Sequence, residues 1–287
     1  MSNEKVLAKM EKDIYLRGLS DSTLYGYSKS IAIFLDYCGK PADKLTESDV
    51  RKFLVYLKED RKLTNGTINC YISAIRFLFE LTLEKPLSQR KVPKFKYNRA
   101  IPTLLTKDEI QRVFENTTNL MYRTILMMIY GSGLRVSEAI NLKVSDIDSE
   151  KMRILIRNGK GGKDRYAPLS HVALDTLRVY WKSYRPKDDL FLTSHKMKPA
   201  VQTIRNIFNK SMASAGIDKH VTIHSLRHSF ATHLLEDDVN IFHIKTLLGH
   251  SSIRSTVWYF QLADTATAGI TCPLDKMTRI PDGGSKE

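Results

Sequence analysis

Hydrophobic residues recur three and four positions apart in four stretches of the first part of the chain, at 6–14, 27–35, 50–57 and 68–79. This spacing places them on one face of a helix, and the polar breaks between the stretches end each helix. The pattern therefore predicts a compact four-helix domain over residues 1–88.

The pattern changes in the middle of the second half of the chain. Hydrophobic and polar residues alternate over 152–157 and again over 165–169, which predicts two strands joined by the Gly- and Lys-rich turn 158–163. A third, short strand is predicted at 190–192. Helical spacing surrounds this sheet, at 106–114, 119–130, 135–142, 172–184, 200–213, 225–235 and 241–248. The sequence thus predicts a mainly α chain with a small antiparallel β-sheet, with an α+β second domain over 104–287.

The composition is that of an ordinary globular protein. Of the 287 residues, 42% are hydrophobic and 26% are charged. The longest apolar run, 125–130, is far shorter than the roughly 20 residues of a membrane span, and the charged N-terminus is unlike a signal peptide. Cys38, Cys70 and Cys272 have neither the even number of a disulfide scaffold nor metal-ligand spacing. We expect a cytoplasmic two-domain protein without a membrane partner.

A basic segment separates the two predicted domains. Residues 89–103 hold five basic side chains and no acidic one, in a chain of net charge +14. The segment contains Pro93 and Pro102 and lacks a helical period, which predicts an extended linker. Lys and Arg that neutralise phosphates release counterions, so nucleic acid is favoured as partner over the alternative of a solvated basic surface. The expected DNA contacts here are Arg90, Lys91, Lys94, Lys96 and Arg99.

Two of the short segments suited to phosphate chemistry lie in the first half of the second domain. Arg135 follows a glycine break just where a helix begins, and the free N–H groups of a helix N-terminus attract anions. Lys160 and Lys163 lie at the glycine-rich tip of the predicted hairpin, where the backbone can approach a ligand closely. Taken singly, each is also explained as a surface arginine or a solvated turn.

Two further segments lie near the C-terminus. In His224-Ser-Leu-Arg227-His228 the three named side chains share one helix face. Such a pair of histidines can bind zinc, but Ser225 stands where a hydrolytic zinc helix has Glu, so no metal site is predicted. The second segment, Leu247 to Ser252, is followed nine residues after its histidine by Tyr259. A single tyrosine is most often a packing residue.

Together, in this order and spacing, the segments resemble the tyrosine site-specific recombinases of the phage-integrase family. The resemblance rests on Gly133–Glu138, Gly159–Gly161, His224–His228 and Leu248–Ser251. It covers most of the chain and implies a helical SAM-like DNA-binding domain that clamps the duplex, a linker, and a catalytic domain akin to type IB topoisomerases.

The resemblance also implies a role for each matched residue. Tyr259 would be the nucleophile that forms a 3′-phosphotyrosyl bond and frees a 5′-hydroxyl, so that strands are rejoined without ATP. Arg135 and Arg227 would hold the nonbridging oxygens of the scissile phosphate, in place of a metal. Lys160 would protonate the leaving oxygen, with Lys163 as the alternative acid or a DNA contact.

The histidines and one carboxylate would support these groups. His224 and His250 would lie beside the phosphate, donating hydrogen bonds or helping to move the tyrosine proton. Glu138 would orient Arg135, and His228 would be structural. No metal or other cofactor is expected.

The implied partner is double-stranded DNA with specific recombination sites, bound by a homotetramer, while the free protein could be a monomer. The surroundings of Tyr259 depart from the family, since Trp258 and Phe260 flank it where many relatives have Tyr-Thr-His, and the tail leaves room only for a short helix at 263–270. These departures favour integration, excision or transposition of a mobile element over chromosome-dimer resolution. The alternatives are a catalytically silent DNA-binding regulator, a topoisomerase acting without partner sites, and a metal-dependent nuclease.

Overall fold

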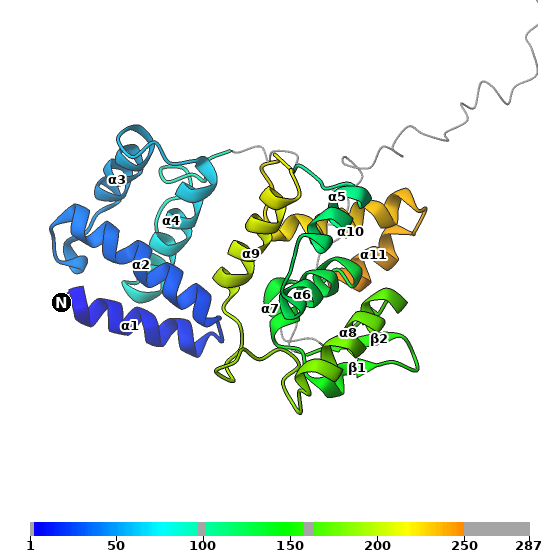
Figure 1. The fold of residues 1–287 in the computed structure, drawn as a ribbon. Coiled ribbons are helices and arrows are strands. Elements are labelled where there is room, and N and C mark those ends of the chain that lie inside the picture. The colour runs from blue at the N-terminus through cyan, green and yellow to red at the C-terminus, as the bar shows by residue number, and fades with distance from the viewer. Residues whose placement is uncertain (1–2, 97–101, 158–163, 250–287) are drawn as a thin grey trace, which may run out of the picture. The chain divides into compact units, whose positions relative to one another are not determined.

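The computed structural model describes residues 3–96, 102–157 and 164–249, and the chain forms two compact units, Met1–Ala100 and Ile101–Glu287. Each unit has a hydrophobic core of its own. Figure 1 draws the first unit in blue to cyan and the second in green to orange. None of the helices in these described ranges is long and apolar enough to cross a membrane.

The N-terminal unit contains the four predicted helices. The middle of its core is aromatic, because Phe34 packs against Phe53 and Phe79 with ring centroids 5.1 and 6.5 Å apart. Thr46 and Asp49 cap the third helix reciprocally. The elements are α1 (Asn3–Leu16), α2 (Asp21–Cys38), the 3₁₀ turn η1 (Ala42–Lys44), α3 (Glu47–Glu59), α4 (Asn65–Phe77) and the π-helical turn η2 (Leu78–Thr82).

The first part of the expected linker is docked on this unit. Val92 is fully buried in the N-terminal core. Arg76 on α4 donates to the Val92 carbonyl at 2.7 Å, and Asn69 both donates to and accepts from the backbone of Phe95 at 2.9 Å. Residues 89–96 therefore lie against the helices they follow, because their two hydrophobic residues, Val92 and Phe95, pack on the core between exposed basic ones.

Docking of this segment predicts a cost for trimming Val92. Val92→Ala should lower the free energy of unfolding of the N-terminal unit by about 2 kcal/mol, since two buried methyl groups are lost and a cavity remains. The matched control is Val55→Ala, whose side chain is 52% exposed and whose effect should stay within about 0.5 kcal/mol. Urea unfolding of the full chain measures both, and equal effects would contradict docking of 89–96.

The C-terminal unit consists of helices with a small sheet at one side (Figure 1). The central helix α6 packs against α8 and α10, and its Leu126 and Ile129 are fully buried. The helices are α5 (Lys107–Glu115), α6 (Leu120–Gly131), α7 (Val136–Ile140), η3 (Val144–Asp146), α8 (His171–Tyr184), α9 (Val201–Ser214), α10 (Ile223–Glu236) and α11 (Ile241–Leu248). The mainly α architecture with a small sheet is confirmed.

The antiparallel sheet has the order β1-β2-β3, formed by β1 (Ile147–Asp148), β2 (Arg153–Ile156) and β3 (Arg165–Pro168). Ile154 pairs with Ala167 and Ile156 with Arg165, so these positions share the face that the core covers.

The predicted third strand at 190–192 is wrong, since the third strand is β1. Leu190 makes a single backbone bond to the Leu142 carbonyl at 2.9 Å, and its own carbonyl accepts from the Tyr180 hydroxyl at 3.0 Å. Phe191 is fully buried. The apolar run is therefore loop backbone packed into the core, and its hydrophobicity reflects burial instead of strand pairing.

Candidate active site

A left-handed glycine and a short helix present the first predicted arginine. Gly133, at φ +61°, turns the chain after α6, and Arg135 stands at the N-terminus of α7. A carboxylate oxygen of Glu138 accepts from the Arg135 backbone N–H at 2.7 Å, and the other accepts from the Arg135 guanidinium at 2.6 Å. One carboxylate thus caps the helix and holds the arginine side chain.

The second predicted arginine is buried beside the first. Arg227, on α10, is 5% exposed. It donates at 2.6 Å to the carbonyl of Gly133 and at 2.6 Å to the carbonyl of Leu248, the last residue of α11. Its guanidinium also lies 3.6 Å from Glu138. The structure therefore brings Arg135, Glu138 and Arg227 together, from segments far apart in the sequence.

A third arginine joins this cluster. Arg165, at the start of β3, forms a two-bond ion pair with Glu138, at 2.9 and 2.8 Å. No role for Arg165 follows from the sequence motifs. A signal was present, because Arg165 lies two residues from Ala167 and so shares the core-facing side of the strand, where a charge needs a partner.

Arg165 and Arg135 stabilise the charged form of the Glu138 carboxylate. Burial alone would raise the pKa of Glu138, but hydrogen bonds and charge attraction from Arg165 and Arg135 outweigh it and lower that pKa to about 2. One negative charge therefore faces three positive ones. The cluster keeps a surplus of positive charge, which suits an anion such as a phosphate diester.

His224 lies at the edge of this cluster, on the same helix as Arg227. Although it keeps contact with solvent, partial burial and the positive charges of Arg205, Arg227 and Arg135 lower its pKa. A neutral imidazole offers one donor and one acceptor. The arrangement is compatible with hydrogen bonding to a phosphate or with proton transfer.

The other histidines of α10 face the interior. Burial, His224 and Arg227 lower the pKa of His228 to about 4. His233 is nearly buried, with its Nδ1 3.0 Å from the Tyr130 hydroxyl. Within the described ranges, no group of three or more His, Cys, Asp or Glu side chains is placed to hold a metal ion.

Several predicted residues lie outside the described residues. They are Lys160 and Lys163 of the hairpin tip, His250, Tyr259 and, in the basic segment, Arg99. The described part of the predicted site therefore consists of Arg135, Glu138, His224 and Arg227.

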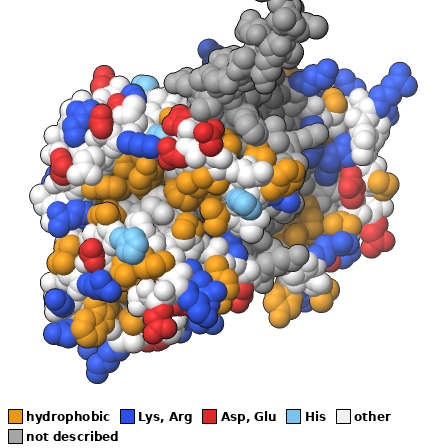
Figure 2. All heavy atoms as spheres, turned by 90° about the vertical axis from the view of Figure 1, so that its right-hand side faces the viewer, with side chains coloured by type: hydrophobic (Ala, Val, Ile, Leu, Met, Phe, Trp, Pro, Cys, Tyr) orange, Lys and Arg blue, Asp and Glu red, His pale blue; other side chains and the backbone are white. Residues whose placement is uncertain are grey.

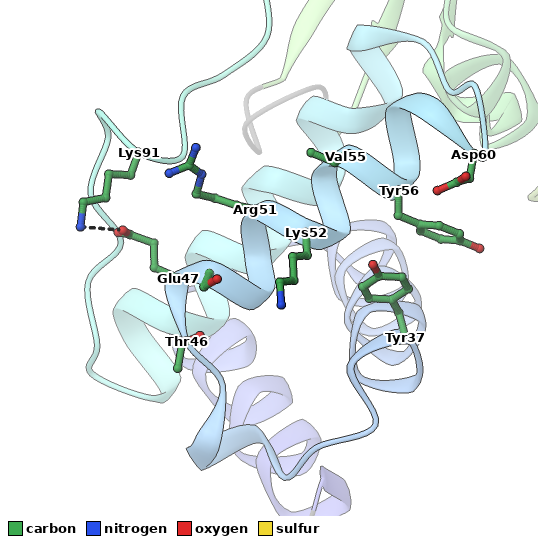
Figure 3. A pocket seen from close by; sticks show the side chains of 10 residues that line it. Tyr37, Thr46, Glu47, Arg51, Lys52, Val55, Tyr56, Asp60 and Lys91 are labelled. Atoms are coloured by element: carbon green, nitrogen blue, oxygen red, sulfur yellow. Dashed lines mark ion pairs between the residues drawn. The ribbon is translucent and has the colours of Figure 1, made fainter.

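The other predicted DNA contacts lie on the N-terminal unit. Arg90, Lys91, Lys94 and Lys96 are all exposed. Figure 3 shows Lys91 beside an open pocket on α3, where it pairs with Glu47 at 3.2 Å, and two further basic side chains of α3, Arg51 and Lys52, line the same pocket.

One face of the molecule carries no continuous basic patch among its described residues. In Figure 2, Lys and Arg side chains are scattered among acidic and hydrophobic ones. Charge alone therefore does not mark a DNA-binding surface on the face in that view.

Comparison with known sequences decides the family. The profile of the phage integrase family matches residues 103–266, and that of the phage integrase N-terminal SAM-like domain matches residues 6–89. The chain belongs to the phage integrase family. It is a tyrosine recombinase, an enzyme of site-specific DNA recombination, and the recognition from sequence motifs is confirmed.

Relatives of this recombinase match along most of their length. The putative integrase/recombinase y4qK of Sinorhizobium fredii is 36% identical over 273 residues, which is 94% of this chain and 89% of that protein. Tyrosine recombinase XerA of Thermococcus kodakarensis is 33% identical, covering 89% of this chain and 90% of its own. Tyrosine recombinase XerD of Oceanobacillus iheyensis is 36% identical, covering 85% and 88%.

Solved structures share the fold of the recombinase. A crystal structure of XerA recombinase is 27% identical with a TM-score of 0.54 and covers 92% of this chain and 95% of that one. The Tn1549 transposon integrase in complex with transposon right end DNA is 19% identical with a TM-score of 0.72, covering 89% and 94%. The second likeness supports the fold alone.

The turn at Gly133 predicts a strong effect of a methyl group. In Gly133→Ala the new Cβ would lie 2.5 Å from the Phe230 ring in a left-handed conformation, so the free energy of unfolding should fall by about 3 kcal/mol. Gly216→Ala is the matched control, since Gly216 has φ +66° with nothing within 4 Å, and it should lose about 1 kcal/mol. Chemical denaturation measures both. Equal losses would show that contact with Phe230 does not matter.

Burial of His228 predicts a pH effect on stability. Its folded pKa of about 4 lies below the ordinary 6.5, so between these values the unfolded chain binds a proton that the folded chain does not. The contribution of His228 to stability should therefore be fully present above pH 6.5 and be lost as the pH falls to about 4, a loss of about 3 kcal/mol. In His228→Gln, the decrease in unfolding free energy that comes from protonation of His228 should disappear. Parallel pH profiles of unfolding free energy for the wild type and His228→Gln would contradict this role of His228.

Proposed function

We propose that this recombinase cuts and rejoins double-stranded DNA through a covalent bond to Tyr259, without metal or ATP. The observation that carries the proposal is the cluster in which Arg135 and Arg227 meet around Glu138, with more positive than negative charge. Such a cluster can stabilise the extra negative charge that develops on a phosphate under attack. Membership of the family supports the same chemistry.

In the proposed reaction the Tyr259 oxygen attacks the scissile phosphorus and loses its proton. The bond from phosphorus to the 5′-oxygen breaks, and that oxygen takes a proton from Lys160, with Lys163 as the alternative donor. Arg135 and Arg227 hold the nonbridging oxygens, and Glu138 orients Arg135. His224 and His250 donate hydrogen bonds or move the tyrosine proton. Attack by a 5′-hydroxyl on the phosphotyrosine reverses the step and rejoins a strand.

The proposed biological role is integration, excision or transposition of a mobile element by a cytoplasmic enzyme acting as a homotetramer on two DNA sites. Relatives named integrase/recombinase support the role in mobile DNA. The basic residues Arg90, Lys91, Lys94, Lys96, Arg99 and Lys163 are proposed as contacts to the DNA backbone, where they would position the protein without reading sequence.

The covalent step is tested with a nicked duplex taken from the DNA that flanks the gene, incubated in EDTA and quenched with SDS. The wild-type chain should become linked to a 3′ DNA end, because no metal is needed, and Tyr259→Phe should not. Gel analysis of labelled DNA measures the adduct. Tyr184→Phe is the control substitution, since Tyr184 is 47% exposed at the end of α8, and it should keep the adduct.

The other outcomes separate the alternatives. An adduct formed by Tyr259→Phe would exclude Tyr259 as nucleophile. Binding of the duplex by both proteins without any adduct would favour the DNA-binding regulator. Cleavage that leaves a free DNA end and stops in EDTA would identify a metal-dependent nuclease.

A further inference from the structure

Arg165 connects three elements of the active site. Its guanidinium holds both carboxylate oxygens of Glu138 on α7, at 2.9 and 2.8 Å, and its Nε donates to the carbonyl of Leu247 on α11 at 3.0 Å. The side chain is only 10% exposed. Each of its three nitrogen atoms thus donates to a protein acceptor, on α7 or on α11.

Glu138 lies closer to Arg165 than to Arg227. The same carboxylate oxygen that Arg165 holds at 2.8 Å lies 3.6 Å from the guanidinium of Arg227. Arg227 instead donates to two carbonyl oxygens, of Gly133 and Leu248. A guanidinium binds a carboxylate more strongly than a carbonyl. With Arg165 absent, Glu138 would attract Arg227 and neutralise the charge that the phosphate needs.

The end of α11 is held by the same group. Arg165 and Arg227 bind the carbonyls of consecutive residues, Leu247 and Leu248. Gly249 follows at φ +62°, and a Cβ there would lie 2.8 Å from Cδ of Arg165. The Arg165 side chain therefore packs directly against the backbone at this helix end. This packing holds its guanidinium next to Glu138.

We propose that Arg165 is a positioning residue of the recombinase, which occupies both oxygens of Glu138 and so keeps Arg227 bound to the backbone with its positive charge available to the scissile phosphate. This inference rests on the proposed role of Arg135 and Arg227 in phosphate binding. Removal of Arg165 harms the reaction through the carboxylate that it leaves uncompensated.

The decisive comparison is between Arg165→Met and the double variant Arg165→Met/Glu138→Gln. With saturating nicked duplex from the flanking DNA, Arg165→Met should form the adduct about 100-fold more slowly, as expected for a misplaced reacting group, with DNA affinity changed less than about threefold. The double variant should recover at least about tenfold of that rate, because the neutral amide introduced in place of the carboxylate no longer attracts Arg227 as a charge.

Two further variants complete the kinetic series. Arg165→Lys, which keeps the charge but not the two-bond geometry, should fall between wild type and Arg165→Met. Arg178→Met is the matched control, since Arg178 is exposed on α8 and pairs only with Asp175 among its described contacts, and its rate should equal that of wild type. Thermal melting verifies that each variant is folded. A double variant no faster than Arg165→Met overturns the proposal, because the loss would then come from the missing cross-link.

A crystal structure of Arg165→Met tests the same idea without activity. The Arg227–Glu138 distance should shorten from 3.6 Å to about 2.8 Å, the length of a charged hydrogen bond. An unchanged distance overturns the proposal. If wild type forms no adduct but Arg227 moves in the variant, the proposed function fails and the positioning role of Arg165 stands.

Discussion

The carboxylate of Glu138, shared among Arg135, Arg165 and Arg227, is the interaction on which the catalytic unit depends. A buried carboxylate is costly unless charged hydrogen bonds replace water. Here Arg135 of α7 and Arg165 of β3 donate such bonds, and Arg227 of α10 adds a positive charge 3.6 Å away. These elements are distant in sequence and share no other common partner of opposite charge among the contacts described. The ion cluster therefore fixes the sheet relative to the helices and builds the anion site in one step.

Gly133 and Gly249 allow the backbone turns on which the contacts of Arg227 depend. Arg227 reaches the carbonyls of Gly133 and Leu248 because the backbone beside each adopts a left-handed turn, at Gly133 and at Gly249. At both turns a Cβ would meet a neighbouring side chain at close range, Phe230 at 2.5 Å in one case and Arg165 at 2.8 Å in the other. The glycines of the predicted arginine and histidine motifs thus serve close packing as well as backbone freedom.

The fold was largely predictable from sequence, because helices with one apolar face and a capped start carry local signals. The capping residues Thr46 and Thr106 begin helices where the pattern indicates. Features that depend on tertiary contacts were harder to predict from the sequence. The run at 190–192 is apolar because it is buried as a loop, and Val92 turns part of an apparent linker into core.

In the candidate site, too, local sequence motifs were predictable and tertiary contacts were not. Motif spacing pointed to Arg135, Glu138, His224 and Arg227, and the structure gathers the first, second and fourth of these in direct contact. It did not point to Arg165, whose partner lies 27 residues earlier in the chain. Only the pairing of β3 with β2 and the packing of α7 bring the two together. The hairpin lysines, His250 and Tyr259 lie outside the described ranges, so their roles stay predictions drawn from the resemblance of the motifs.

The number of carboxylates in the cluster is itself a functional constraint. Without Glu138, guanidinium groups would repel one another at short range, and nothing would orient Arg135. With a second carboxylate, the positive charge would be balanced internally and a phosphate would gain little by entering. A single carboxylate among three arginines leaves a surplus of positive charge in the protein alone, so the proposed reaction would need little reorganisation of the cluster. The surplus costs stability in the free protein, and in the proposed function a bound phosphate would offset that cost.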